Sequence, residues 1–309
     1  MTSFAYLSAS SFLKVEPVGD APRPFGLAGV AWDGSTTNRP GARFGPRAIR
    51  EASHMLCDGI HPVFDCSPLG QLDDHGDLAL PNTGIGPMRA EMEKLLPALL
   101  ARQHMVWLGG DHSITLPILR ALKAQQGRPL AVIHFDAHCD TWPDHFGERS
   151  GHGTWVYEAM QEGLVVDACF TKIGIRSAGE RSAREYVSDR GGLICTARDL
   201  RGLENRQQLA HVITEVRERL AAHGNPPVYI SLDIDCLDPA FAPGTGTPEP
   251  GGMSSSQVLT LLEEFASLNC VGMDCVEVAP AYDHAELTSS AAATFVWTYL
   301  CGQLAKTAA

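Results

Sequence analysis

The segment AVIHFDAHCDTW, residues 131–142, decides the fold and marks the candidate site. Residues 131–133 are apolar and predict the middle of a buried strand. Asp136, His138 and Asp140 follow at alternate positions, so their side chains point to one side if the chain stays extended. Buried carboxylates are costly unless they are paired or bind a metal. The segment therefore predicts a binding site at the end of a buried strand.

Short apolar runs of this kind alternate along the chain with longer amphipathic segments. Several runs are apolar at both odd and even positions, as in a parallel sheet that helices cover on both faces. The alternation predicts an α/β fold with three layers, α/β/α, and a mostly parallel central sheet. We expect one domain over residues 1–309, with residues 1–22 as an N-terminal extension. The predicted strands are 25–32, 104–109, 130–136, 169–176, 192–196, 227–234 and 271–277, and the predicted helices are 45–57, 86–103, 114–126, 154–163, 179–189, 203–223, 254–268 and 288–305.

Polar side chains follow other predicted strands as well. They occur in WLGGDHS at 107–113, in YISLDID at 229–235 and in VGMDCVE at 271–277. Sites in open α/β sheets form beyond the carboxyl ends of the strands, so we expect these groups to meet. The candidate metal ligands are two histidines and four aspartates: His112, Asp136, His138, Asp140, Asp233 and Asp235.

The composition of this ligand set indicates which metal it suits. Four clustered carboxylates repel one another without cations between them. Carboxylates combined with imidazoles favour Mn²⁺, and six ligands exceed the four that a tetrahedral zinc takes. The sequence therefore predicts two adjacent divalent ions, with Mn²⁺ as the expected metal.

Composition narrows the class of protein. The formal charge of −12 argues against a nucleic-acid surface and agrees with a cationic small substrate. No run of 18 apolar residues predicts a membrane span, and residues 1–20 lack the pattern of a signal peptide. The nine cysteines are an odd number without a CxxC pair, which favours a reducing compartment. We expect a cytoplasmic protein without disulfide bonds.

Three motifs, GGDHS, FDAHCD and SLDIDCLDPAFAPGTGTP, resemble those of the ureohydrolase family, which includes arginase and agmatinase. The resemblance runs from residue 39 to residue 288, and VEVAPAYD at 276–283 is most similar to agmatinase. It implies the arginase/deacetylase-like fold and a two-metal hydrolase that uses Mn²⁺ or, as in some members, Ni²⁺. One ion would be held by His112, Asp136, Asp140 and Asp235, and the other by His138, Asp136, Asp233 and Asp235.

The resemblance also implies roles for residues outside the ligand set. Asp140, His152 and Glu277 form the expected catalytic group: Glu277 would bind the guanidinium and His152 would move protons. Thr247 would line the guanidinium pocket beside them. The alternatives are a strand-end ion pair for Glu277 and an ordinary loop position for His152. Asp111 and Asp274 are expected to support ligands rather than to bind metal.

Some residues differ from those that are common in the family's motifs. Cys139 stands where Thr is common, and its position between two ligands predicts that it points to the opposite face. Trp142, Trp155 and Tyr157 could form an aromatic wall for a cationic substrate, or could belong to the core or a subunit contact.

The predicted reaction is hydrolysis of a guanidino compound to urea and an amine, with agmatine giving putrescine as the first choice. The alternatives are guanidinobutyrate, guanidine or a biguanide such as metformin, or a non-catalytic partner subunit of such an enzyme. A zinc-dependent deacylase on the related fold is disfavoured, since it needs one metal. The family resemblance implies a homotrimer or homohexamer, and a hetero-oligomer with a homologous subunit is also open.

Overall fold

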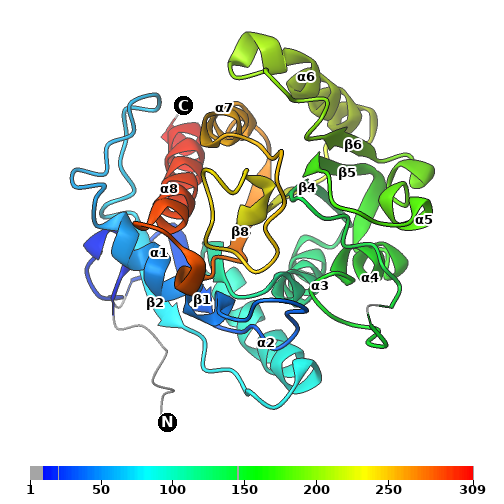
Figure 1. Ribbon diagram of the computed structural model, residues 1–309. Helices are drawn as coiled ribbons and strands as arrows, with labels where there is room; N and C mark the ends of the chain where they lie inside the picture. The colour runs from blue at the N-terminus through cyan, green and yellow to red at the C-terminus, as the bar shows by residue number, and fades with distance from the viewer. Residues whose placement is uncertain (1–9, 20, 145, 309) are drawn as a thin grey trace.

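The central feature of the fold is one sheet of eight strands, all of them parallel (Figure 1). The computed structural model describes residues 10–19, 21–144 and 146–308. The strands lie in the order β2-β1-β3-β8-β7-β4-β5-β6. They are β1 (Phe25–Val30), β2 (Leu72–Asp77), β3 (His104–Gly109), β4 (Leu130–Phe135), β5 (Val165–Ile175), β6 (Leu193–Thr196), β7 (Val228–Asp233) and β8 (Cys270–Val276).

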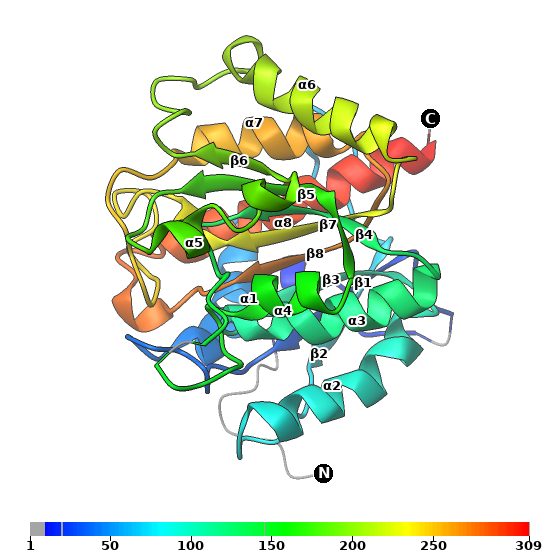
Figure 2. The same cartoon turned by 90° about the vertical axis from the view of Figure 1, so that its right-hand side faces the viewer.

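Helices lie on both faces of this sheet, which makes the three layers that the sequence predicts (Figure 2). Helices α1, α6, α7 and α8 pack against one another on one face, and α2, α3 and α4 do so on the other. The α-helices are α1 (Gly45–Ser53), α2 (Ile85–Leu100), α3 (Thr115–Gln126), α4 (Trp155–Gln161), α5 (Arg181–Arg184), α6 (Arg206–Ala222), α7 (Ser255–Phe265) and α8 (Leu287–Ala308). Short 3-10 helices span Phe12–Lys14, Ala42–Phe44, His112–Ile114, Ser188–Arg190, Ile234–Cys236 and Pro280–Tyr282.

Each face of the sheet has its own hydrophobic core, because neighbouring residues of a strand point to opposite faces. In β4, Ile133 belongs to the core beneath α6, α7 and α8, whereas Val132 belongs to the core beneath α2, α3 and α4. In β3, Val106 and Trp107 divide between the two cores in the same way. This explains why the central strands are apolar at both odd and even positions.

Most of the predicted strands and helices are present in the structure, with ends that differ by a few residues, and there are two exceptions. Strand β2 was not predicted, and the helix expected over 179–189 is only the four-residue α5, followed by the short 3-10 helix at Ser188–Arg190. Helix α7 begins as expected at a serine cap: Ser254 Oγ accepts from Gln257 N at 3.1 Å, and Gln257 Oε1 accepts from Ser254 N at 2.9 Å.

The N-terminal segment lies against α1 and β2 where it is described. Phe12 is buried, its backbone N–H donates to Asp74 at 2.8 Å, and Leu13 N donates to Ser53 Oγ at 2.7 Å. Residues 1–9 of the expected extension lie outside the described residues. None of the helices in the described part of the chain has the length and apolar character needed to cross a bilayer.

Candidate metal centre

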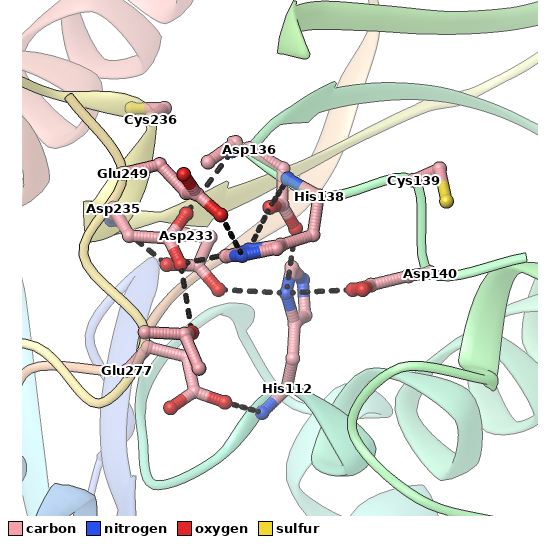
Figure 3. Close-up of polar contacts among 12 residues, drawn as sticks. His112, Asp136, His138, Cys139, Asp140, Asp233, Asp235, Cys236, Glu249 and Glu277 are labelled. Atoms are coloured by element: carbon pink, nitrogen blue, oxygen red, sulfur yellow. Dashed lines mark hydrogen bonds and ion pairs between the residues drawn. The ribbon is translucent and has the colours of Figure 1, made fainter. Parts of the chain in front are cut away.

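The predicted site residues come from four strands that are neighbours in the middle of the sheet, β3, β8, β7 and β4. His112 lies just after β3, and Asp136, His138 and Asp140 follow β4. Asp233 ends β7, Asp235 lies in the 3-10 helix that follows it, and Glu277 follows β8. Because all four strands are parallel, their carboxyl ends meet at one edge of the sheet. This topology brings together side chains that are far apart in the sequence (Figure 3).

One group of ligand atoms surrounds His112. Its Nδ1 atom lies 3.2 Å from Asp136 Oδ2, 3.4 Å from Asp140 Oδ2 and 3.1 Å from Asp233 Oδ2. The imidazole and all three carboxylates are buried. Three carboxylates around one imidazole nitrogen form a set that can hold a divalent cation.

A second group lies beside the first and shares Asp136 with it. His138 Nδ1 lies 3.0 Å from Asp235 Oδ2 and 3.3 Å from Asp136 Oδ1. The two oxygens of Asp136 therefore face different imidazoles, Oδ2 toward His112 and Oδ1 toward His138. Asp136 has the position of a carboxylate between two cation sites.

The grouping of the aspartates differs from the one expected. Asp235 was expected in both groups, but Asp233 is the residue that contacts His112, and Asp235 contacts His138. Strand periodicity indicates the side on which a residue lies, and it does not give distances across the site. Cys139 lies apart from the carboxylates and imidazoles, as expected (Figure 3).

His134, which was not predicted as a site residue, also contacts the cluster. Its Nε2 atom lies 2.7 Å from Asp136 Oδ2, and the ring is fully buried. His134, His112, Asp136 and Asp140 can bring one ligand atom each to within 4.8 Å of one another. The signal was present, because His134 continues the alternate positions of Asp136 and His138 backwards into the strand.

A layer of polar groups behind His112 orients its ring. His112 Nε2 lies 2.8 Å from Ser231 Oγ, and Ser231 Oγ donates to Asp274 at 2.8 Å. Since the Ser231 hydroxyl is donated to Asp274, it accepts from Nε2–H, which leaves Nδ1 as the ring nitrogen that faces the carboxylates. Asp111 instead accepts from Ser113 N at 3.0 Å and caps the turn that carries His112. Both aspartates thus support ligand-bearing segments.

Charge repulsion within the cluster raises the pKa values of two of its aspartates. Burial, followed by the charge of Asp136, raises the pKa of Asp140 to about 7. Burial and the neighbouring charge of Asp235 hold the pKa of Asp233 well above its ordinary range. Burial lowers the pKa of His112, but the hydrogen bond and charge of Asp136 outweigh it and raise that pKa to about 9. Divalent cations would relieve this repulsion, so the donor set fits two of them.

Glu277 and His152 form a pair next to the cluster. Glu277 Oε1 accepts from His112 N at 2.9 Å and lies 3.1 Å from His152 Nδ1. Burial lowers the pKa of His152, but the hydrogen bond and charge of Glu277 outweigh it and raise the pKa to about 9. Glu277 Oε2 is buried and has no hydrogen-bond partner among the described residues. A bound donor would satisfy that oxygen.

A cavity of about 490 Å³ opens above the cluster, with His112, His138, Asp140 and Asp233 among its walls. His152 and Thr247 line it as well, and Thr247 Oγ1 donates to Asp235 at 3.3 Å. Phe146, Glu180 and Glu249 also line it and were not predicted as site residues. Phe146 and Glu249 lie on irregular segments without a periodic pattern, and Glu180 was expected inside a helix but is the N-cap residue of the short α5.

Only one of the three expected aromatic residues lines the cavity. Trp142 does so, whereas Trp155 is fully buried and donates through Nε1 to Asp140 Oδ2 at 2.8 Å. Tyr157 packs against Tyr186, with ring centroids 5.3 Å apart. The prediction that these residues form an aromatic wall is therefore wrong for Trp155 and Tyr157. For Trp155 the alternative of a core position is confirmed.

Comparison with known proteins agrees with this fold. The chain is 39% identical over 287 residues to an agmatinase of Chromobacterium violaceum, covering 89% of this chain and 82% of the relative. It is 40% identical over 297 residues to the proclavaminate amidinohydrolase of Streptomyces clavuligerus, covering 92% and 90%. The solved structure of a proclavaminate amidino hydrolase from that organism matches with a TM-score of 0.87 and 36% identity, covering 98% of this chain and 100% of that one. The model of the arginase family matches residues 23–302. The chain therefore belongs to the arginase family, as its ureohydrolase motifs predict.

Proposed function

We propose that this metal-dependent amidinohydrolase cleaves a guanidino compound to urea and an amine, and that agmatine, which gives putrescine, is its substrate. The observation that carries the proposal is the pair of His/Asp groups that share Asp136 beside the cavity. His112, Asp136, Asp140 and Asp233 would hold one ion, and His138, Asp136 and Asp235 the other. Mn²⁺ suits this mixed set of imidazoles and carboxylates, and Ni²⁺ is the alternative. When bound, the ions supply Lewis acidity, which makes water a stronger acid and stabilises developing negative charge.

The residues around the ions would orient the substrate and move its proton. Glu277 Oε2 offers a buried acceptor to a guanidinium N–H, and such a charge-assisted hydrogen bond is strong. His152 lines the cavity and is held by Glu277 at one nitrogen and by Thr37 Oγ1, 2.8 Å away, at the other. In the metal-free chain the hydrogen bond and charge of Glu277 raise the pKa of His152 to about 9, and a ring that carries this proton can give it to the leaving amine.

The charge of the cavity favours a substrate with a cationic tail. Glu180 and Glu249 line it, and none of the described lining residues is an arginine or a lysine. A guanidino acid needs a cationic partner for its carboxylate, whereas agmatine carries a second positive charge. The relatives do not separate the substrates, because an agmatinase and a proclavaminate amidinohydrolase are 39% and 40% identical to this chain.

The test is urea release from a panel of guanidino compounds. The purified chain, loaded with Mn²⁺ or with Ni²⁺, is assayed with agmatine, guanidinobutyrate, arginine, guanidine and metformin. We expect agmatine to give the highest kcat/KM and Asp136→Asn to abolish urea release. If the loaded chain releases no urea from any of these compounds, the alternative of a non-catalytic partner subunit replaces this proposal. Faster hydrolysis of guanidinobutyrate than of agmatine would agree with the proposed reaction class but would reject agmatine as the substrate.

The proposal extends to assembly and location. We expect a homotrimer or homohexamer, as the family resemblance implies, and a cytoplasmic location, as the cysteine pattern predicts. Light scattering of the purified chain tests the oligomer, and co-purification with a homologous subunit would favour the hetero-oligomer.

A further inference from the structure

Lys172 is a fully buried lysine in the strand next to the metal centre. It lies in β5 directly across from His134 of β4 in the strand register, and its side chain is only 1% exposed. Its ammonium donates to the backbone carbonyl of Cys139. No carboxylate lies within ion-pair distance of it in the described part of the chain. A buried ammonium is costly, and the nearby charges of Asp140 and Asp136 do not outweigh its burial, so its position needs a structural reason.

The carbonyl that Lys172 binds belongs to the turn that carries two of the ligands. Cys139 stands between His138 and Asp140, and both of these flanking side chains enter the cation sites. Asp140 has a φ of +48°, a left-handed conformation that is unfavourable for a residue with a side chain. Such a conformation persists only where surrounding contacts hold it.

Contacts from α4 hold the far side of this turn. The Asp140 carbonyl accepts from Val156 N at 3.1 Å, and its carboxylate accepts from Trp155 Nε1 at 2.8 Å. Lys172 holds the near side, at the peptide between the two ligands. Without that donor, the Cys139 carbonyl would be a buried acceptor left without its ammonium partner, which disfavours this arrangement of the turn.

We propose that Lys172 is a positioning residue, which fixes the turn through the Cys139 carbonyl so that His138 and Asp140 reach their cation sites. The inference rests on the proposed function, because it takes the clusters to be metal sites. Electrostatics alone predicts the opposite effect of removing Lys172. Loss of a positive charge beside the carboxylates would strengthen cation binding, whereas loss of the anchor would weaken it.

The test compares Lys172→Met and Lys172→Gln with the unmodified full-length chain. Metal-free protein is titrated with Mn²⁺ by calorimetry, bound metal per chain is counted after dialysis, and circular dichroism checks the fold. We expect Lys172→Met to bind the weaker-held ion about 10- to 100-fold less tightly, as when an outer partner of a ligand is lost. We expect Lys172→Gln, whose amide can donate to the carbonyl, to recover most of that loss. Lys306→Met is the matched control, because Lys306 also donates to a carbonyl, that of Leu268 at 2.6 Å, far along the chain from the site.

The results of these titrations distinguish the positioning role of Lys172 from the proposed two-metal function. Equal or tighter Mn²⁺ binding by Lys172→Met overturns the positioning role. If Lys172→Met does not fold, Lys172→Gln decides: binding within about threefold of the unmodified chain supports the role, and a larger change in either direction overturns it. An unmodified chain that binds fewer than two ions rejects the two-metal function itself, independently of either variant.

Discussion

His134 Nε2 lies 2.7 Å from Asp136 Oδ2, so a residue inside β4 holds the carboxylate just beyond the strand's end. Burial lowers the pKa of His134 to about 3, and the ring is therefore neutral. A carboxylate only accepts, so the single N–H of the neutral ring is at Nε2. The other nitrogen, Nδ1, is buried without a hydrogen-bond partner among the described residues. The contact with Asp136 is thus the hydrogen bond that satisfies the buried His134 ring among the described residues.

The first prediction concerns this contact. His134→Phe keeps a buried ring but removes the N–H that orients Asp136, and we expect Mn²⁺ affinity to fall about 10- to 100-fold. His134→Gln keeps a donor on a side chain of similar reach and should lose less. Calorimetric titration of the metal-free chains measures both values. Unchanged affinity in His134→Phe would mean that Asp136 is held by its other neighbours.

The second prediction concerns metal stoichiometry. Asp136 faces both imidazoles, so Asp136→Asn should remove both ions. Asp140 contacts only the His112 group and Asp235 only the His138 group, so Asp140→Asn and Asp235→Asn should each remove one. Elemental analysis of dialysed protein counts the ions per chain. Loss of both ions in Asp235→Asn would favour the bridging position that the sequence analysis gave to Asp235.

The third prediction concerns the substrate. Glu277→Gln removes the charge that is proposed to hold the guanidinium, and a hydrogen bond to a charged group contributes about 1.5–3 kcal/mol. We expect kcat/KM for agmatine to fall at least about tenfold while two ions per chain are retained. Glu51→Gln is the control, since Glu51 forms an exposed ion pair with Arg47 outside the cavity and should leave kcat/KM unchanged. Equal losses in the two variants would place the guanidinium elsewhere.

The sequence was sufficient for the central strands and for the residues that meet at their ends. Strand β4 is an apolar run, and its alternation places Asp136, His138 and Asp140 on one side. Periodicity fixes only that side, which is why it could not decide whether Asp233 or Asp235 contacts His112. The cavity residues Phe146 and Glu249 lie on irregular segments, whose positions follow from packing between distant parts of the chain.

Strand β2 shows a different limit. Its sequence, LDDHGD, has charged residues where an apolar run is expected, and it lies at the edge of the sheet. Arg50 of α1 pairs with two of its aspartates: Arg50 Nε donates to Asp74 at 2.8 Å, and Nη1 donates to Asp77. All three side chains are buried. The compensating charge comes from another element, so the pattern within β2 could not reveal the strand.

The fourth prediction tests that ion-pair network. Asp74→Asn leaves Arg50 buried with one carboxylate fewer, and breaking a buried pair costs about 3–5 kcal/mol. Because Asp77 remains, we expect the free energy of unfolding to fall by about 3 kcal/mol. Glu51→Gln on the same helix is the control: it breaks the exposed pair with Arg47, which contributes about 0.5 kcal/mol or less. Urea unfolding measures both, and similar losses would show that the buried network adds nothing.

The fifth prediction concerns pH and uses His104, which lies far from the ligands at the start of β3. Its Nε2 atom lies 2.7 Å from Tyr299 Oη, and its ring packs against Phe25. Burial, followed by the positive charge of Lys306, lowers the pKa of His104 to about 4. In the unfolded chain the group titrates near its ordinary value of about 6.5, so between these two values the unfolded state binds more protons.

Stability from His104 is therefore complete above pH 6.5 and is lost as the pH falls toward 4, by at most about 3 kcal/mol. We expect His104→Gln to flatten the decline in unfolding free energy between these values, measured by urea unfolding of metal-free protein at several pH values. Metal-site carboxylates titrate in both proteins, so the difference between the two curves isolates His104. Replacing the exposed His211 by Gln serves as the control and should leave the curve unchanged. A decline of the same steepness in His104→Gln would assign it to other groups.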